Sequence, residues 1–193
     1  MRALDFGSSS GRVVRVMKAL YPEVDWFACD PNESAIEWAH SNLPEINFTV
    51  SPLTPPLSYE DEFFDFVYAI SVWTHFGGRA ALSWLAEVRR VLRPGGVLVI
   101  TAHGFQTLHK MARERLWDRS DIDRAASDLY ARGHSFTETF GPAGDHGVPA
   151  DEWGWAFLTP EWLLAHACPD WMVLDFRPGY VDENQDLITL RRS

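Results

Sequence analysis

Apolar runs and segments with apolar residues at helical spacing alternate along this chain. Residues 64–70 are almost continuously apolar, as expected of a strand that is buried on both faces. Leu85, Val88 and Leu92 instead recur on one face of a helix. This alternation predicts a doubly wound α/β fold, in which helices cover both faces of a mostly parallel sheet. Seven strands are predicted, at residues 2–6, 26–29, 46–50, 64–70, 97–101, 171–176 and 186–190.

Helix boundaries are marked by capping and breaking residues. Asn32 is a suitable N-cap for a helix over 32–42, and Thr159 followed by Pro160 is a suitable start for the last helix. Pro94 cannot continue a helix, so we expect the helix over 80–92 to end in a Pro-Gly-Gly turn. The remaining predicted helical segments are 11–20 and 107–132.

The chain changes character after the fifth predicted strand. Residues 107–132 are charged, and residues 134–154 are rich in glycine, proline and aspartate, too long a stretch for a simple connection. We expect a single domain over 1–193, with a variable insert at about 105–156 that has a functional or a mobile loop in it. Four aromatic residues near its end either belong to the core or line a pocket, namely Trp153, Trp155, Phe157 and Trp162.

The segment ALDFGSSSGRVVRVM places a turn of glycines and small polar residues between a strand and a helix. Gly7 and Gly11 let the backbone approach a ligand closely, and Asp30 follows Gly11 by 19 residues, at the end of the second strand. Taken singly, the loop is also explained as a tight turn and Asp30 as a helix cap. Together they predict a nucleoside site, although neither a Gly-Lys-Ser/Thr phosphate loop nor the dinucleotide pattern G-x-G-x-x-G is present.

Net charge and cysteine content exclude several classes of function. A net charge of −10 argues against binding of duplex nucleic acid, which needs clustered cations. No apolar run is long enough to span a membrane and no signal peptide precedes the first strand, so we expect a cytoplasmic protein. Cys29 and Cys168 are expected to be small buried groups. No metal site is predicted, because the one loose polar set lacks tight spacing; it comprises His134, Asp145, His146 and Glu152.

The loop pattern and two longer motifs together resemble one family of nucleoside-binding proteins. The pattern D-x-G-x-x-x-G, with Ser9 at the middle position, resembles the D-x-G-x-G-x-G loop of class I S-adenosylmethionine-dependent methyltransferases. EDEFFDFVYAISVWTHF and WLAEVRRVLRPGGVLVITAHG also resemble that family, so the likeness covers roughly residues 2–104 in order. It implies a Rossmann-like methyltransferase fold, a seven-stranded sheet with an antiparallel last strand, and S-adenosyl-L-methionine as the cofactor.

The resemblance also implies which residues hold the methionine end of the cofactor. Gly7, Ser8 and Ser9 would lie beside the methionine moiety. Ala69 and Ile70, at the end of the fourth strand, would offer backbone groups to its amine.

The nucleoside end would be held by the second and third strands. Asp30 would bind the ribose hydroxyls, with Pro31 near the adenine, and Ser51 and Leu53 would flank the adenine ring. Asp5 would fix the loop or reach the amine of the methionine moiety through water.

Two histidines are candidates for a general base, because an imidazole titrates near neutral pH. His75 lies five residues after Ile70, and His103 ends the fifth strand, at the edge where such sheets bind ligands. The alternative for His75 is that it caps or packs the start of the next helix.

The sequence favours methyl transfer to a small-molecule acceptor that it does not identify. Two alternatives remain, a non-catalytic module that binds the cofactor and a nicotinamide oxidoreductase. Members of the family usually carry helices before the first strand, whereas here Met1 lies a few residues before the glycine loop. We therefore expect an open cleft with cofactor affinity in the range of about tens of micromolar, and an apolar patch that a second copy covers in a homodimer.

Overall fold

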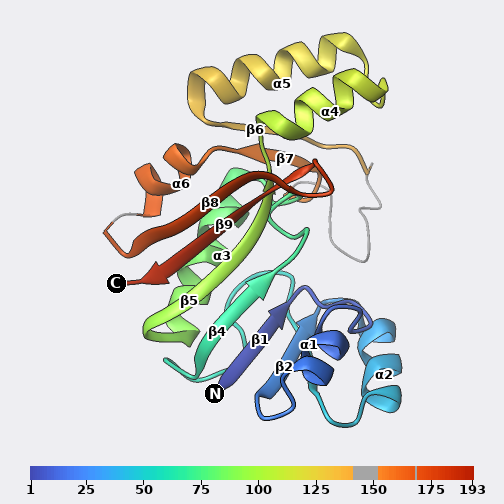
Figure 1. Ribbon diagram of the computed structural model, residues 1–193, viewed down its shortest axis with the longest axis vertical. Coiled ribbons are helices and arrows are strands. Elements are labelled where there is room, and N and C mark those ends of the chain that lie inside the picture. Colours follow the sequence, from blue (N-terminus) through green and yellow to red (C-terminus); the bar gives the residue numbers. More distant parts are fainter. Residues whose placement is uncertain (141–151, 168) are drawn as a thin grey trace.

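The computed structural model describes residues 1–140, 152–167 and 169–193. Its main sheet has the predicted doubly wound topology, with β3, β2, β1, β4 and β5 parallel and β9 antiparallel to β5 (Figure 1). Among the described strands, the edge strand β8 pairs with β9 alone. In order across the sheet these strands are β3 Asn47–Val50, β2 Asp25–Asp30, β1 Arg2–Phe6, β4 Phe64–Ala69, β5 Leu92–His103, β9 Gln185–Arg192 and β8 Trp171–Val181.

A short hairpin that the sequence did not predict adds two strands. β6 His134–Thr137 pairs antiparallel with β7 Trp155–Leu158, and Phe157 joins the hairpin to β5 at His103. The described residues therefore form a nine-stranded sheet. The prediction of an irregular loop over 134–154 is wrong for its first four residues, because their partner strand lies about 20 residues further along the chain.

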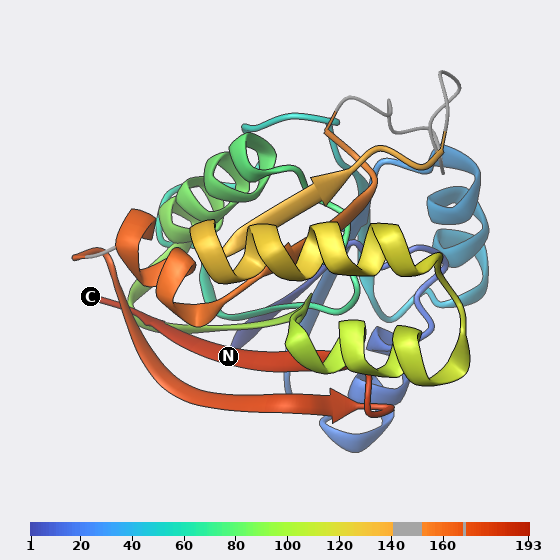
Figure 2. The same cartoon turned by 90° about the horizontal axis from the view of Figure 1, so that it is seen from above.

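Helices cover the sheet on both sides (Figure 2). α1 Val14–Leu20 and α2 Glu33–Asn42 pack on one face, with a core that includes Val14, Trp26 and Ile36. α3 Gly78–Val91 and α6 Pro160–Ala167 pack on the other, with a core that includes Trp84 and Leu163. The predicted caps are confirmed, since the side chain of Asn32 accepts a hydrogen bond from Ala35 and that of Thr159 accepts one from Trp162.

Alternation along β1 sends its side chains to these two cores. Leu4 and Phe6 belong to the core under α3, whereas Ala3 belongs to the core under α1. Asp5 shares the parity of Ala3, so its carboxyl lies on the side of α1, beneath the glycine loop. Asp5, an acidic residue, is thereby buried at the carboxyl end of a central strand.

The insert stands above the carboxyl end of β5 (Figure 1). It contains two helices, α4 Phe105–Glu114 and α5 Arg119–Arg132, rather than the single helical segment predicted over 107–132. Arg115, in the left-handed region at φ 55°, ends α4. Leu108, Met111 and Leu129 pack the two helices against Phe157, which fixes the insert on the β6–β7 hairpin.

Two element boundaries differ from prediction for local reasons. α1 starts at Val14 instead of residue 11, because the glycine loop continues as turns up to Val13. β5 starts at Leu92, five residues early, since Leu92 pairs with Phe64 before a register shift.

Within the described parts of the chain, no helix is both long and apolar enough to cross a membrane.

Candidate functional site

A cavity of about 440 Å³ opens at the carboxyl ends of β1, β2, β3 and β4. That size and position are typical of ligand sites in sheets of this topology. All the cofactor residues predicted from the sequence line it except Gly11 and Ala69. Those that do are Asp5, Gly7, Ser8, Ser9, Asp30, Pro31, Ser51, Leu53 and Ile70.

The glycine loop folds over the end of β2. The amides of Gly7 and Ser8 both donate to the carbonyl of Cys29, at 2.9 and 3.0 Å. Gly7 has a φ of 80°, and a Cβ there would overlap the side chain of Val72. Glycine is therefore required at this point, where the loop passes close to the segment that follows β4.

Asp30 ties the glycine loop to the turn after β2. Its Oδ2 accepts a hydrogen bond from the amide of Ser9 at 2.7 Å, and its Oδ1 accepts one from the amide of Asn32 at 2.9 Å. Both hydrogen bonds stabilise the local backbone, so the interpretation of Asp30 as a cap is partly correct. The carboxylate also lines the cavity, and each of its oxygens has a second lone pair with which to accept from a ligand hydroxyl.

Two predicted residues lie outside the cavity. A Cβ at Gly11 would come within 2.9 Å of both Leu43 and Phe48, so this glycine allows the loop to pack against α2 and β3. Ala69 is fully buried within β4, and Ile70 and Ser71 line the cavity after it.

Asp5 is the buried acid of the cavity. Its carboxyl is 3% exposed, and its Oδ2 has no hydrogen-bond partner among the described residues. Burial, with a smaller contribution from the charge of Asp30, raises the pKa of Asp5 to about 7, against the opposing effects of hydrogen bonds from Tyr68 and Val14 and of the charge of Arg12. The unpartnered Oδ2 provides an acceptor for a cationic ligand group.

His75 lines the cavity beside aromatic side chains. Its Nδ1 donates to the carbonyl of Gly154 at 2.8 Å, and its ring stacks on Trp153 with centroids 4.7 Å apart. Because a carbonyl only accepts, the proton of the neutral ring is on Nδ1 and the lone pair is on Nε2. The predicted alternative was that His75 caps or packs the start of α3. The capping contact is made by Glu152, whose carboxylate accepts from Ala80 in the first turn of that helix, while the ring of His75 packs on Trp153.

His103 is not in the cavity. It is 3% exposed and stacks on Trp155, with ring centroids 5.0 Å apart. Burial, with a smaller contribution from His75, lowers the pKa of His103 to about 3. The prediction that His103 is a base at the site is therefore corrected, because the strand end that carries it is covered by the β6–β7 hairpin.

The end of the insert is attached along the segment that carries His75. Backbone hydrogen bonds join Gly77 to Glu152, Gly154 to His75 and Ala156 to Thr74, at 2.9–3.0 Å. Glu152 adds an ion pair to Arg79 at 2.7 Å. Of the four clustered aromatic residues, only Trp153 lines the cavity. Trp155 and Phe157 pack around His103, and Trp162 stacks on His134.

The prediction of a functional or mobile loop falls mainly on residues 141–151, which lie outside the described residues. The loose polar set is described only in part. Asp145 and His146 lie outside the described residues, whereas His134 and Glu152 belong to them. Among the residues that the structure does describe, no group of histidine, cysteine or acidic side chains is arranged to hold a metal ion.

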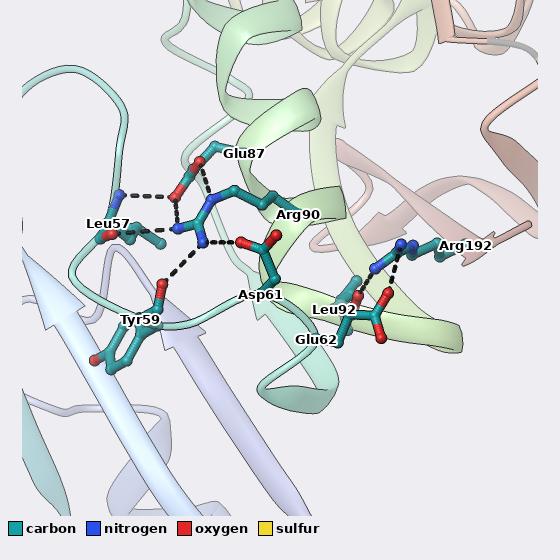
Figure 3. Close-up of polar contacts among 8 residues, drawn as sticks. All are labelled: Leu57, Tyr59, Asp61, Glu62, Glu87, Arg90, Leu92 and Arg192. Carbon is teal, nitrogen blue, oxygen red and sulfur yellow. Dashed lines mark hydrogen bonds and ion pairs between the residues drawn. The ribbon is translucent and has the colours of Figure 1, made fainter.

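A partly buried ion pair that sequence reasoning missed holds the loop after β3 (Figure 3). Glu87 is 6% exposed, and its Oε1 accepts from the amide of Leu57 at 2.7 Å and from Arg90 Nη2 at 2.6 Å. Arg90 also donates to the carbonyl of Tyr59 at 2.9 Å and to Asp61 at 2.7 Å. This Glu87–Arg90 clamp fastens to α3 the loop whose first residues, from Ser51, line the cavity.

Comparison with known proteins points to the same family as the sequence motifs. Residues 4–100, about half of the chain, match the family described as methyltransferase domain. A malonyl-[acyl-carrier protein] O-methyltransferase of Hahella chejuensis is 29% identical over 124 residues, which are 63% of this chain and 42% of that protein. The chain thus spans less than half the length of this relative.

Solved structures match over nearly the whole chain. A protein from Pyrococcus horikoshii, PH0226, has a TM-score of 0.68 at 16% identity, over 100% of this chain and 82% of that one. A SAM-dependent methyltransferase from Methanosarcina mazei has a TM-score of 0.67 at 19% identity, over 99% of this chain and 92% of that one. At these identities the likeness concerns the fold. Together with the family match, it means that the chain belongs to the methyltransferase domain family and has the class I fold of S-adenosylmethionine-dependent methyltransferases.

Proposed function

We propose that the cavity binds S-adenosylmethionine and that the protein transfers its methyl group to a small-molecule acceptor. One observation carries this proposal: residues from four separate loops, each matched to the family by sequence, converge on one cavity. They are the glycine loop, Asp30 and its neighbours, the loop that starts at Ser51, and Ile70 after β4. The chain's membership of the methyltransferase domain family supports the same reading.

The chemical character of the cavity fits this cofactor at both ends. At the nucleoside end, Asp30 offers carboxylate lone pairs to a ribose diol, while Pro31 and Leu53 offer apolar surface to a base. At the other end, the unpartnered Oδ2 of Asp5 suits a positively charged ligand, and the cofactor would supply an electrophilic sulfonium methyl group when bound.

His75 is proposed as the general base for the acceptor. The hydrogen bond to Gly154 keeps the neutral ring with its lone pair on Nε2, the form that accepts a proton. As the bond from the acceptor oxygen or nitrogen to the methyl carbon forms, the sulfur–methyl bond breaks and the acceptor proton passes to Nε2. Phe76, Trp84 and Trp153 line this part of the cavity and help to exclude water.

An acceptor with a neutral hydroxyl or amine group agrees best with these surroundings, because it has a proton for His75 to remove. A carboxylate acceptor is the second candidate, since the Hahella chejuensis relative is named as an O-methyltransferase of a malonyl-carrier protein. A carboxylate needs no base, but it does need a cation beside it. The described lining residues around His75 are aromatic or uncharged.

The test is a calorimetric titration of the protein with S-adenosylmethionine and, separately, with NAD. We expect binding of the first and none of the second. Labelled-methyl transfer is then measured on phenols, alcohols, amines and a malonyl thioester. Saturable binding of NAD alone would overturn the proposal, and tight cofactor binding with no transfer to any acceptor would favour a non-catalytic module.

A further inference from the structure

The turn that follows β4 is held by side chains from two other strands. Ser71 lines the cavity directly after Ile70. Its amide donates to Oγ1 of Thr101, on β5, at 2.7 Å. Both ends of the Gln185 carboxamide, on β9, face its hydroxyl: Nε2 donates to Oγ at 2.8 Å, and Oγ lies 3.1 Å from Oε1. The turn is thus tied to a side chain 114 residues further along the chain.

These contacts hold Ser71 in a backbone conformation that residues other than glycine rarely adopt. Its φ of 61° lies in the left-handed region, where the backbone crowds the Cβ. Such a conformation persists where the surrounding structure fixes it. Thr101 is fully buried and pairs with Leu187, and Gln185 pairs with His103, so both anchors stand on the paired strands β5 and β9.

The same turn forms one wall of the cavity. Ile70 and Val72, on either side of Ser71, both line it. Val72 also lies against the glycine loop, because a Cβ at Gly7 would overlap its side chain. A change in the backbone of Ser71 would therefore move Val72 relative to the glycine loop and change the shape of the cavity between them. Gln185 itself is not among the described residues that line the cavity.

We propose that Gln185 is a positioning residue, which acts through the hydroxyl of Ser71 to hold the turn after β4 in the shape that binds the cofactor. This inference rests on the proposed function. Serine at position 71 supplies a hydroxyl by which β9 can hold the turn, whereas glycine would adopt the same φ without strain but offer no such anchor. A carboxamide suits the hydroxyl because it presents both a donor and an acceptor to it.

The experiment is a double-mutant cycle on the affinity for S-adenosylmethionine, measured by calorimetry. Gln185→Leu removes the carboxamide, and Ser71→Ala removes the hydroxyl but keeps the strained Cβ, so each variant tests the link from one side. Ser71→Gly removes the strain as well. Thr189→Val is the matched control, because Thr189 lies on the same face of β9, is also half-buried and does not line the cavity. Urea unfolding of each variant separates a loss of affinity from a loss of stability.

We expect Gln185→Leu and Ser71→Ala each to weaken S-adenosylmethionine about fivefold, and the double variant to lose no more than either one. Ser71→Gly should bind within about twofold of the unaltered protein, and adding Gln185→Leu to it should change nothing further. Thr189→Val should bind normally.

Three results would overturn the role of Gln185 while leaving the proposed function in place. One is a Gln185→Leu variant that is less stable but has unchanged affinity, and another is additive losses in the double variant. The third is an equal loss from Gln185→Leu in the Ser71→Gly background, since Gln185 would then act other than through the Ser71 hydroxyl. Failure of the unaltered protein to bind S-adenosylmethionine would overturn the proposed function and this inference together.

Discussion

The Nδ1 atom of His75 lies 2.8 Å from the carbonyl oxygen of Gly154, so a residue after β4 is oriented by a residue 79 positions later, at the end of the insert. The amide of Gly154 in turn donates to the carbonyl of His75 at 2.9 Å. This reciprocal contact makes the protonation form of the ring a property of how the insert packs. It also separates the role of Nδ1, which positions the ring, from that of Nε2, which carries the lone pair of the neutral ring.

The first prediction concerns the separate roles of the two ring nitrogens of His75. Asparagine at position 75 places its amide nitrogen near the position of Nδ1, so His75→Asn keeps a donor for Gly154 but removes the base. We expect turnover to fall about 10²- to 10⁴-fold, with cofactor affinity within about twofold. Steady-state kinetics and calorimetry check this, with His109→Asn on the exposed face of α4 as the control. Unchanged turnover in the folded variant would remove His75 from the mechanism.

The second prediction concerns the cost of burying Asp5. Its pKa is about 7 in the folded protein, against an ordinary value of 3.8, so the folded state holds a proton that the unfolded state has lost. Stability is therefore lost as pH rises from about 4 to about 7, and the loss is constant above that range. Asp5→Asn removes this effect and should raise the free energy of unfolding by about 1–3 kcal/mol at pH 8.

Thermal unfolding at several pH values measures the effect of Asp5→Asn. The gain should shrink below pH 7 and vanish near pH 4, where both states of the unaltered protein hold the proton. Asp25→Asn, at the exposed start of β2, should show no such trend. A gain that is the same at pH 5 and pH 8 would contradict the raised pKa. The variant should also bind S-adenosylmethionine more weakly, so this position trades stability for ligand recognition.

The third prediction concerns the missing middle glycine of the loop. Ser9 has a φ of 49°, in the left-handed region, which costs a non-glycine residue about 1–2 kcal/mol. The greater freedom of glycine in the unfolded chain offsets about 0.5–1 kcal/mol of this. Ser9→Gly should therefore raise the unfolding free energy by about 0.5 kcal/mol, measured by urea denaturation. Ser10 is not in that region, so Ser10→Gly should lower it.

The fourth prediction concerns the Glu87–Arg90 clamp. Arg90→Met leaves the Glu87 carboxylate buried without its ion-pair partner, which should cost about 3–5 kcal/mol of stability. Arg89→Met, on the same helix, breaks a pair with Asp170, whose carboxylate is much more exposed than that of Glu87, and should cost less than about 1 kcal/mol. Denaturant unfolding of the two variants makes the comparison. Equal losses would mean that the clamp does not hold the loop after β3.

The sequence predicted the parts of this protein that depend on local pattern. The caps at Asn32 and Thr159 and the nearness of Gly7 to Asp30 follow from spacing in the sequence, and the place of Ile70 at the same edge follows from the resemblance to the family. What it missed depends on distant partners. β6 pairs with a strand after the insert, Gly11 meets Leu43 and Phe48, and Glu87 meets Leu57.

His103 shows the same limit at the site itself. Its position at a strand end was predicted correctly, but the hairpin that covers this strand end is a tertiary feature. A strand-end histidine and a cavity histidine look alike in sequence. The structure distinguishes them because His75 follows β4, whose end is open, whereas His103 ends β5, whose end is covered.

The most direct test of the central claim is the affinity of Asp30→Ala for S-adenosylmethionine, measured by calorimetry. If Asp30 binds the ribose, the variant should lose about 1.5–3 kcal/mol of binding free energy. Asp25→Ala, at the other end of the same strand, serves as the control and should bind normally. A folded Asp30→Ala variant with the affinity of the unaltered protein would contradict the assignment of this cavity to the cofactor.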